Sequence, residues 1–184
     1  MPDLPEAPWQ SGAMNPLRRL LVPVLAIALS LGCQDASSPP VDGRAFGSRV
    51  SAWLRDSTAA ITHEYYSGFG DSTNLVVEDS YTWAVTWARL YASLRPRPLL
   101  PTVDFRTERV VLVALGGRST GGYDIRVDSV VRFQRGGVTY VTATSPGNRC
   151  VTTQALTQPV DVIRLSPRVE PIAFQQRAVV RDCS

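Results

Sequence analysis

The chain of 184 residues contains no lysine, one histidine (His63) and three cysteines. Most zinc sites need more histidine and cysteine ligands than this composition offers, so we expect no metal. The phosphate-binding P-loop requires a lysine and is therefore absent, and no motif indicates another cofactor. A catalytic Ser-His-Asp triad would have to use His63, which lies in a strand-like stretch and is expected to be a packed or surface residue.

Charged residues are also few and nearly balanced. Arginine supplies all 19 basic residues against 16 acidic ones, which gives a formal net charge of +3. An excess this small does not indicate a nucleic-acid partner. Hydrophobic residues make up 44% of the chain, a proportion that is typical of a globular domain and not of a disordered one.

An apolar run over residues 20–31 follows Arg18 and Arg19 and ends at Gly32-Cys33. A basic stretch, a short apolar core and a small residue predict a secretory signal peptide over residues 1–32. The run is shorter than the roughly 20 residues that span a bilayer. Residues 1–13 contain Asp3 and Glu6, whereas the N-terminal region of a signal peptide is basic. We therefore interpret residues 1–13 as a mis-assigned start and Met14 as the true one.

The end of the apolar run resembles a bacterial lipobox, in which lipid is attached to the cysteine and the chain is cleaved before it. An ordinary signal peptide with a cysteine nearby is the alternative. Lipidation of Cys33 would anchor the protein to a membrane of the bacterial cell envelope, facing the periplasm or the exterior. Residues 33–48 are rich in Ser, Pro and Gly without apolar periodicity and predict a flexible tether, so the folded domain is expected over residues 49–184.

Two cysteines remain beyond the predicted anchor, Cys150 and Cys183. An exported compartment permits disulfides, and a bond between these two would hold the C-terminal segment in place. The alternatives are that both cysteines are free thiols or that the two cysteines together bind a metal ion. We predict the disulfide.

One segment has the spacing of a helix. Trp83, Trp87, Leu90, Tyr91 and Leu94 fall on one helical face, which predicts a helix over about residues 80–95. Ser80 is the expected N-cap, and Pro96 and Pro98 end the helix. Both tryptophans are interpreted as core residues.

The rest of the domain reads as strands separated by turns. Residues 50–54 form a short helix or strand. Strands are predicted over residues 58–66, 75–77, 110–115, 123–128, 138–144, 151–156, 160–165 and 172–180. The fold class is therefore α+β and mainly β: an antiparallel sheet or sandwich with one packed helix.

Residues 117–121 match the G-x-S-x-G nucleophile motif of α/β-hydrolases. That motif needs a strand, a tight turn and then a helix, whereas the segment after Gly121 alternates like a strand. The hydrolase order also places histidine after the serine, but His63 precedes Ser119. We expect a chance match and a protein that is not an enzyme.

The same stretch is the tip of a glycine-rich loop over residues 116–123. Four glycines allow close backbone approach, which suits a strand connection with a bulge as well as a recognition loop on a rigid sheet. Tyr123 would be an aromatic anchor if exposed, or core because it shares a face with Ile125 and Val127. The candidate binding residues are Arg118, Ser119, Thr120, Gly121, Gly122 and Tyr123.

From about residue 80 to residue 165 the chain resembles the C-terminal domain of the PrcB (protease complex subunit) family. The resemblance is carried by short motifs in order: Val103-Asp104-Phe105, the strand 110–115, Gly116, Thr120-Gly121-Gly122-Tyr123, Ser145-Pro146-Gly147, Cys150, the run 151–157 and Pro159. It implies an exported, often lipid-anchored protein that binds and stabilises a secreted serine protease and has no catalytic residues.

The alternative is an inhibitor of the chagasin type, a β-sandwich whose Asn-Pro-Thr-Thr-Gly-Tyr loop enters the cleft of a cysteine protease. Thr120, Gly121 and Tyr123 match that loop, but the Asn-Pro is missing.

Overall fold

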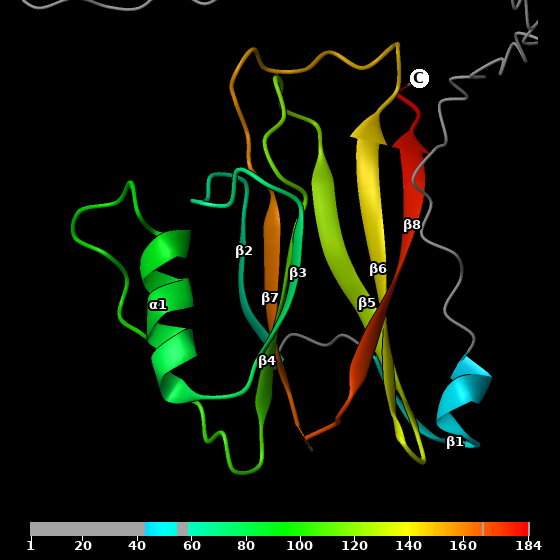
Figure 1. The fold of residues 1–184 in the computed structure, drawn as a ribbon. Helices are drawn as coiled ribbons and strands as arrows, with labels where there is room; N and C mark the ends of the chain where they lie inside the picture. The colour runs from blue at the N-terminus through cyan, green and yellow to red at the C-terminus, as the bar shows by residue number, and fades with distance from the viewer. Residues whose placement is uncertain (1–42, 55–58, 167, 184) are drawn as a thin grey trace, which may run out of the picture. The chain divides into compact units, whose positions relative to one another are not determined.

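The computed structural model describes residues 43–54, 59–166 and 168–183. They form two four-stranded sheets, with one helix against one of them (Figure 1). The predicted class is confirmed: the domain is mainly β with a single α-helix. Among these residues, no helix is long and apolar enough to cross a membrane.

The first sheet has the strand order β2-β7-β4-β3 and is antiparallel throughout. Its strands are β2 (Ala60–Glu64), β3 (Thr73–Val77), β4 (Arg109–Ala114) and β7 (Val160–Leu165). All six residues of β4 are buried, as its apolar sequence predicts for a central strand. Helix α1 (Ser80–Leu90) covers one face of this sheet, and the second sheet covers the other.

The second sheet has the strand order β1-β5-β6-β8. Its strands are β1 (Arg49–Leu54), β5 (Asp124–Phe133), β6 (Gly136–Pro146) and β8 (Ile172–Arg181). A tight turn joins β5 and β6. The pair β6 and β8 is parallel, so the predicted all-antiparallel arrangement is wrong at this edge. The chain leaves the sheet after β6 to form β7 in the other sheet, and therefore returns in the same direction.

Two further predictions need correction. Residues 151–156 form no strand; only Thr157 makes an isolated bridge, to Arg118. Val151 and Leu156 are exposed, so this β-branched stretch has no buried face to order it as a strand. The helix begins one residue earlier than a Ser80 cap would require, because Asp79 is the N-cap and its carboxylate accepts the Thr82 N–H at 2.8 Å.

The core consists of two clusters on opposite faces of the first sheet. The helix-side cluster contains the aromatic residues Phe69, Trp83, Trp87 and Tyr91. The inter-sheet cluster contains aliphatic residues from β4, β5, β6 and β7. Both clusters lie within the described residues, so this segment has a hydrophobic core of its own.

The predicted signal peptide, Cys33 and residues 34–42 lie outside the described residues. The last residues of the predicted tether are in contact with the domain. Gly43–Phe46 forms a 3-10 turn, η1, and the Phe46 ring lies 6.4 Å from that of Phe133 on β5. Gly43–Phe46, which the prediction places in the tether, is thus part of the described domain.

Candidate functional site: a pocket at the loop end of the sandwich

Three loops meet at the end of the sandwich where the C-terminus also lies (Figure 1): residues 65–72, 116–123 and 147–159. Backbone hydrogen bonds join them. The Gly117 N–H donates to Gly70 O at 2.8 Å, and the Gln158 N–H donates to Tyr65 O at 2.8 Å. Arg118 and Thr157 exchange two hydrogen bonds of 2.8 and 2.9 Å. The 116–123 loop is therefore held on both sides, in contrast to a free-standing loop.

Glycine is required at the tip of this loop for two reasons. A Cβ at Gly121 would lie 2.3 Å from the Oγ1 of Thr153, so the Thr153 side chain would have to move, while the Gly121 N–H donates to Thr153 O. Gly122 has a φ of +85°, which residues other than glycine rarely adopt. The glycine-rich sequence is thus needed to bring the second and third loops together.

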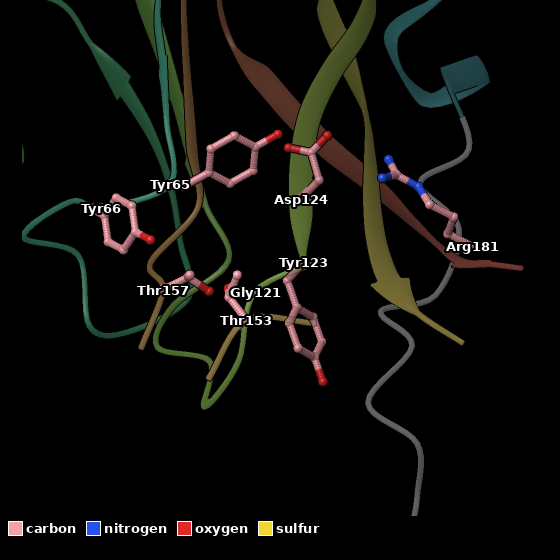
Figure 2. Close-up of a pocket in the computed structure, with 9 residues that line it drawn as sticks. Tyr65, Tyr66, Gly121, Tyr123, Asp124, Thr153, Thr157 and Arg181 are labelled. Atoms are coloured by element: carbon pink, nitrogen blue, oxygen red, sulfur yellow. The ribbon is translucent and has the colours of Figure 1, made fainter. Parts of the chain in front are cut away.

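The three loops surround a pocket of about 260 Å³ (Figure 2). Three tyrosines stand around it: Tyr65 and Tyr66 from the first loop, and Tyr123 from the second. The other lining residues are Gly121, Gly122, Asp124, Thr153, Thr157 and Arg181. The pocket therefore combines aromatic walls with hydroxyl, carboxylate and guanidinium groups.

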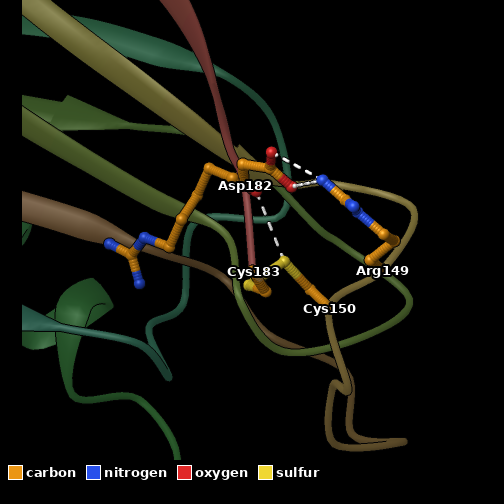
Figure 3. The surroundings of a disulfide bond; sticks show 5 residues. Arg149, Cys150, Asp182 and Cys183 are labelled. Atoms are coloured by element: carbon orange, nitrogen blue, oxygen red, sulfur yellow. Dashed lines mark hydrogen bonds and ion pairs between the residues drawn. A yellow bond between two sulfur atoms is a disulfide. The ribbon is translucent and has the colours of Figure 1, made fainter.

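A disulfide between Cys150 and Cys183 fixes the third loop to the end of β8 (Figure 3). This confirms the predicted pairing. Arg149 and Asp182, the residues before each cysteine, form an ion pair with hydrogen bonds of 2.8 and 3.0 Å. The double connection holds the segment that carries Arg181 beside the 147–159 loop.

Behind the pocket, His63 lies between two carboxylates. Its Nε2 is 2.9 Å from the Oδ1 of Asp124, in the geometry of an ion pair more than of a linear hydrogen bond. Its Nδ1 is 3.3 Å from the Oδ1 of Asp161, which is fully buried. Arg126 and Tyr65 complete its surroundings: Arg126 pairs with Asp124 at 3.0 Å, and the Tyr65 ring meets the imidazole edge-on.

Two strand irregularities make this cluster possible. The register of β2 shifts between Ala60 and Thr62, and His63 then faces Asp161 in the interior between the sheets. In β5, the register of the pairing with β6 shifts between Val127 and Ser129, next to the Val127 N–H. The Oδ2 of Asp161 accepts that N–H at 2.9 Å and so connects the two sheets.

The two carboxylates hold His63 in its charged form. Contact with Asp124, then with Asp161, outweighs burial and raises the pKa of His63 to about 9. Burial alone would raise the pKa of Asp124, but its bonds to His63 and Arg126 together lower it. At neutral pH the imidazole therefore has no free lone pair and cannot act as a general base.

The G-x-S-x-G match lacks the surroundings that a hydrolase nucleophile has. The segment after the G-x-S-x-G match is strand β5 and not a helix, as expected. Both ring nitrogens of His63 are taken by carboxylates, so Ser119 has no histidine to activate it. The described residues contain no group of side chains that could hold a metal ion.

The structure divides the predicted loop residues into two sets. Gly121, Gly122 and Tyr123 line the pocket, whereas Arg118, Ser119 and Thr120 do not. Tyr123 is half-buried against the inter-sheet cluster and also lines the pocket. The Arg118 guanidinium lies 5.5 Å above its ring.

Sequence reasoning missed most of the lining. Tyr65, Tyr66 and Arg181 come from segments distant from the glycine-rich loop. The paired tyrosines before Ser67-Gly68, at the end of a strand, were the signal that could have pointed to the first loop. Nothing in the sequence around Asp124 and Asp161 indicates that they meet at His63.

The fold and site define a two-sheet, mainly β domain with one covering helix and a tyrosine-walled pocket built by three loops. Within it, residues 109–166 match the family model described as PrcB C-terminal. The match runs from β4 to β7, includes two of the three pocket loops and agrees with the resemblance that the motifs indicate. No curated protein and no solved structure matches the chain.

Proposed function

We propose that this protein is a non-catalytic, exported binding protein that holds a protein partner at the loop end of its sandwich. One observation carries the proposal: three loops from distant parts of the chain surround one tyrosine-walled pocket, where hydrogen bonds join them to one another and a disulfide fixes the third loop to the end of β8. Binding surfaces are commonly built from loops held on a rigid sheet.

The composition of the pocket suits a protein partner. Tyr65 is 43% exposed and Tyr66 is 63% exposed, so both rings are accessible. Tyrosine and arginine are enriched in the centres of protein interfaces, where they contribute much of the binding energy. Because these bonds already order the loops in the free protein, the entropic cost of binding is reduced.

The family match suggests the partner. PrcB resemblance implies a secreted serine protease that this protein stabilises. Lipid attachment at Cys33 would keep the domain at a membrane of the cell envelope and raise its effective concentration toward a protease at that membrane. Cys33 and the tether belong to the proposal on sequence grounds alone.

The test is capture of the full chain from its own membrane, identification of bound proteins by mass spectrometry, and titration of the partner found. We expect a secreted protease to bind, and Tyr66→Ala to weaken binding about tenfold or more. The control is Tyr81→Ala on α1, which also removes an exposed tyrosine but lies on another part of the surface. Equal affinities of the two variants would reject the loop end as the binding site.

A second assay separates stabilisation from inhibition. The protein is added to a subtilisin-like and to a papain-like protease, and residual activity is followed with time. A stabiliser prolongs the activity of the serine protease. Stoichiometric loss of the cysteine protease's activity would instead support the chagasin-type alternative, and in that case Tyr123→Ala should relieve the inhibition.

A further inference from the structure

A second surface, distant in sequence from the pocket, carries apolar side chains in water. On helix α1, Tyr81 is 78% exposed and Val85 is exposed one turn later, with Ala84 and Ala88 beside them. Apart from Arg89 in the last turn, the exposed positions of this helix carry no charge, although surface helices usually place charged residues there.

The segment after the helix extends this surface. The Trp83 Nε1–H donates to Pro101 O at 2.9 Å and the Trp87 Nε1–H donates to Pro98 O at 3.0 Å, so residues 98–101 run along α1. Figure 1 shows the segment beside α1, on the side away from the two sheets. Leu99, at 92% exposed, projects into solvent from it. We call this surface the α1 face; it comprises Tyr81, Val85, Leu94, Arg95, Arg97, Leu99 and Leu100.

The charge of the α1 face has one sign. No acidic residue occurs between Asp79 and Asp104 in the sequence, whereas this stretch contains three arginines. Arg89 is used within the fold, because its guanidinium lies 4.4 Å above the Phe69 ring. Arg95 and Arg97 are exposed among the leucines, and the Arg97 side chain makes no bond to any other residue that the structure describes.

We propose that the α1 face docks on the surface of a bilayer that contains anionic phospholipids. Protruding leucines insert at the boundary of headgroups and acyl chains, and arginines beside them meet the phosphates. A bilayer accepts projecting side chains without a shaped cavity. A second copy of the chain is disfavoured as the occupant because a symmetric contact would bring the arginines of two α1 faces together. The predicted lipid anchor is not needed for this inference.

The experiment measures vesicle binding by residues 34–184, which contain the whole described core and lack Cys33. Vesicles of phosphatidylglycerol and phosphatidylcholine in equal parts are compared with vesicles of phosphatidylcholine alone. We expect binding to the mixed vesicles, weaker binding without phosphatidylglycerol, and further loss in high salt. Leu99→Asp should weaken binding about tenfold or more, and Arg97→Gln about fivefold.

Two matched variants serve as controls. Leu156→Asp makes the same change at another exposed leucine, in the 147–159 loop, and Arg132→Gln removes an exposed arginine from β5. Both should bind vesicles like the parent chain. The proposal is overturned if the parent chain does not bind, or if the control variants lose as much binding as the α1-face variants. It is also overturned if the protein is a dimer that Leu99→Asp converts to a monomer, because the face would then be an interface between copies.

Discussion

The two faces of the sheet β2-β7-β4-β3 are buried in different ways. The helix side is filled by aromatic rings: Trp83 and Trp87 on α1 and Tyr91 at its C-cap, whose neighbouring rings meet tilted or edge-on. The inter-sheet side is aliphatic and ends in a charged cluster of His63, Asp124 and Asp161. The first depends on residues close in the sequence and the second on three distant strands, which explains why only the first could be predicted.

The largest expected effect is on the helix side. Trp83→Ala removes a buried indole and its hydrogen bond to Pro101, and should lower the free energy of unfolding by about 4 kcal/mol. Urea denaturation measures the change. Tyr81→Ala, two residues earlier on the same helix, should alter stability by less than about 0.5 kcal/mol because the ring is exposed. Similar losses for both variants would contradict the described orientation of α1.

The inter-sheet side should instead make the stability of the fold depend on pH. Because the folded protein raises the pKa of His63 from 6.5 to about 9, the charged cluster stabilises the fold fully below pH 6.5. That contribution, at most about 3 kcal/mol, is lost as the pH rises from 6.5 through 9. Asp124 acts in the opposite direction: its lowered pKa gives stability that is lost as the pH falls below 3.8.

The control for this pH dependence separates the two faces. Urea denaturation between pH 6 and pH 9.5 should show a falling stability for the parent chain and for Trp83→Ala, whose change is on the other side of the sheet. His63→Gln should be less stable than the parent chain at pH 6, and its stability should not fall between pH 6 and pH 9. A parent chain of constant stability over this range would show that the cluster does not hold a charged imidazole.

The smallest effect concerns the start of the helix. The Asp79 carboxylate accepts the Thr82 N–H and Thr82 Oγ1–H, and these bonds lower its pKa. Asp79→Ala should therefore lower the melting temperature by a few degrees, measured by circular dichroism at neutral pH. Ser80→Ala should leave the melting temperature nearly unchanged. A larger fall in melting temperature for Ser80→Ala than for Asp79→Ala would show that Ser80 is the N-cap, as the sequence predicted.

Much of the fold could be predicted because its signals are local. The helix follows from the spacing of Trp83, Trp87 and Leu90, and β4 follows from an uninterrupted apolar run. The strand predicted over residues 151–156 is wrong because it, too, rested on a local signal alone. Their β-branched side chains favour a strand, but strand formation depends on a partner and a buried face, and neither is provided there.

The candidate site could be predicted only in part. Gly121, Gly122 and Tyr123 were identified because glycine-rich loops stand out in a sequence. Tyr65, Tyr66 and Arg181 could not be assigned to the same pocket, since no short-range pattern records which loops lie at the same end of a sandwich. The parallel pairing of β6 with β8 was missed because it depends on β7 leaving for the other sheet.

The sequence by itself determined the mainly β class, the single helix, the Cys150–Cys183 pairing and the PrcB resemblance, because hydrophobic period, cysteine count and ordered motifs are properties of neighbouring residues. Only the tertiary structure decided that three loops enclose one pocket and that His63 lies between Asp124 and Asp161. His63 is 61 positions from Asp124 and 98 positions from Asp161, and such contacts exist only where sheet twist, strand register and bulges bring the strands together.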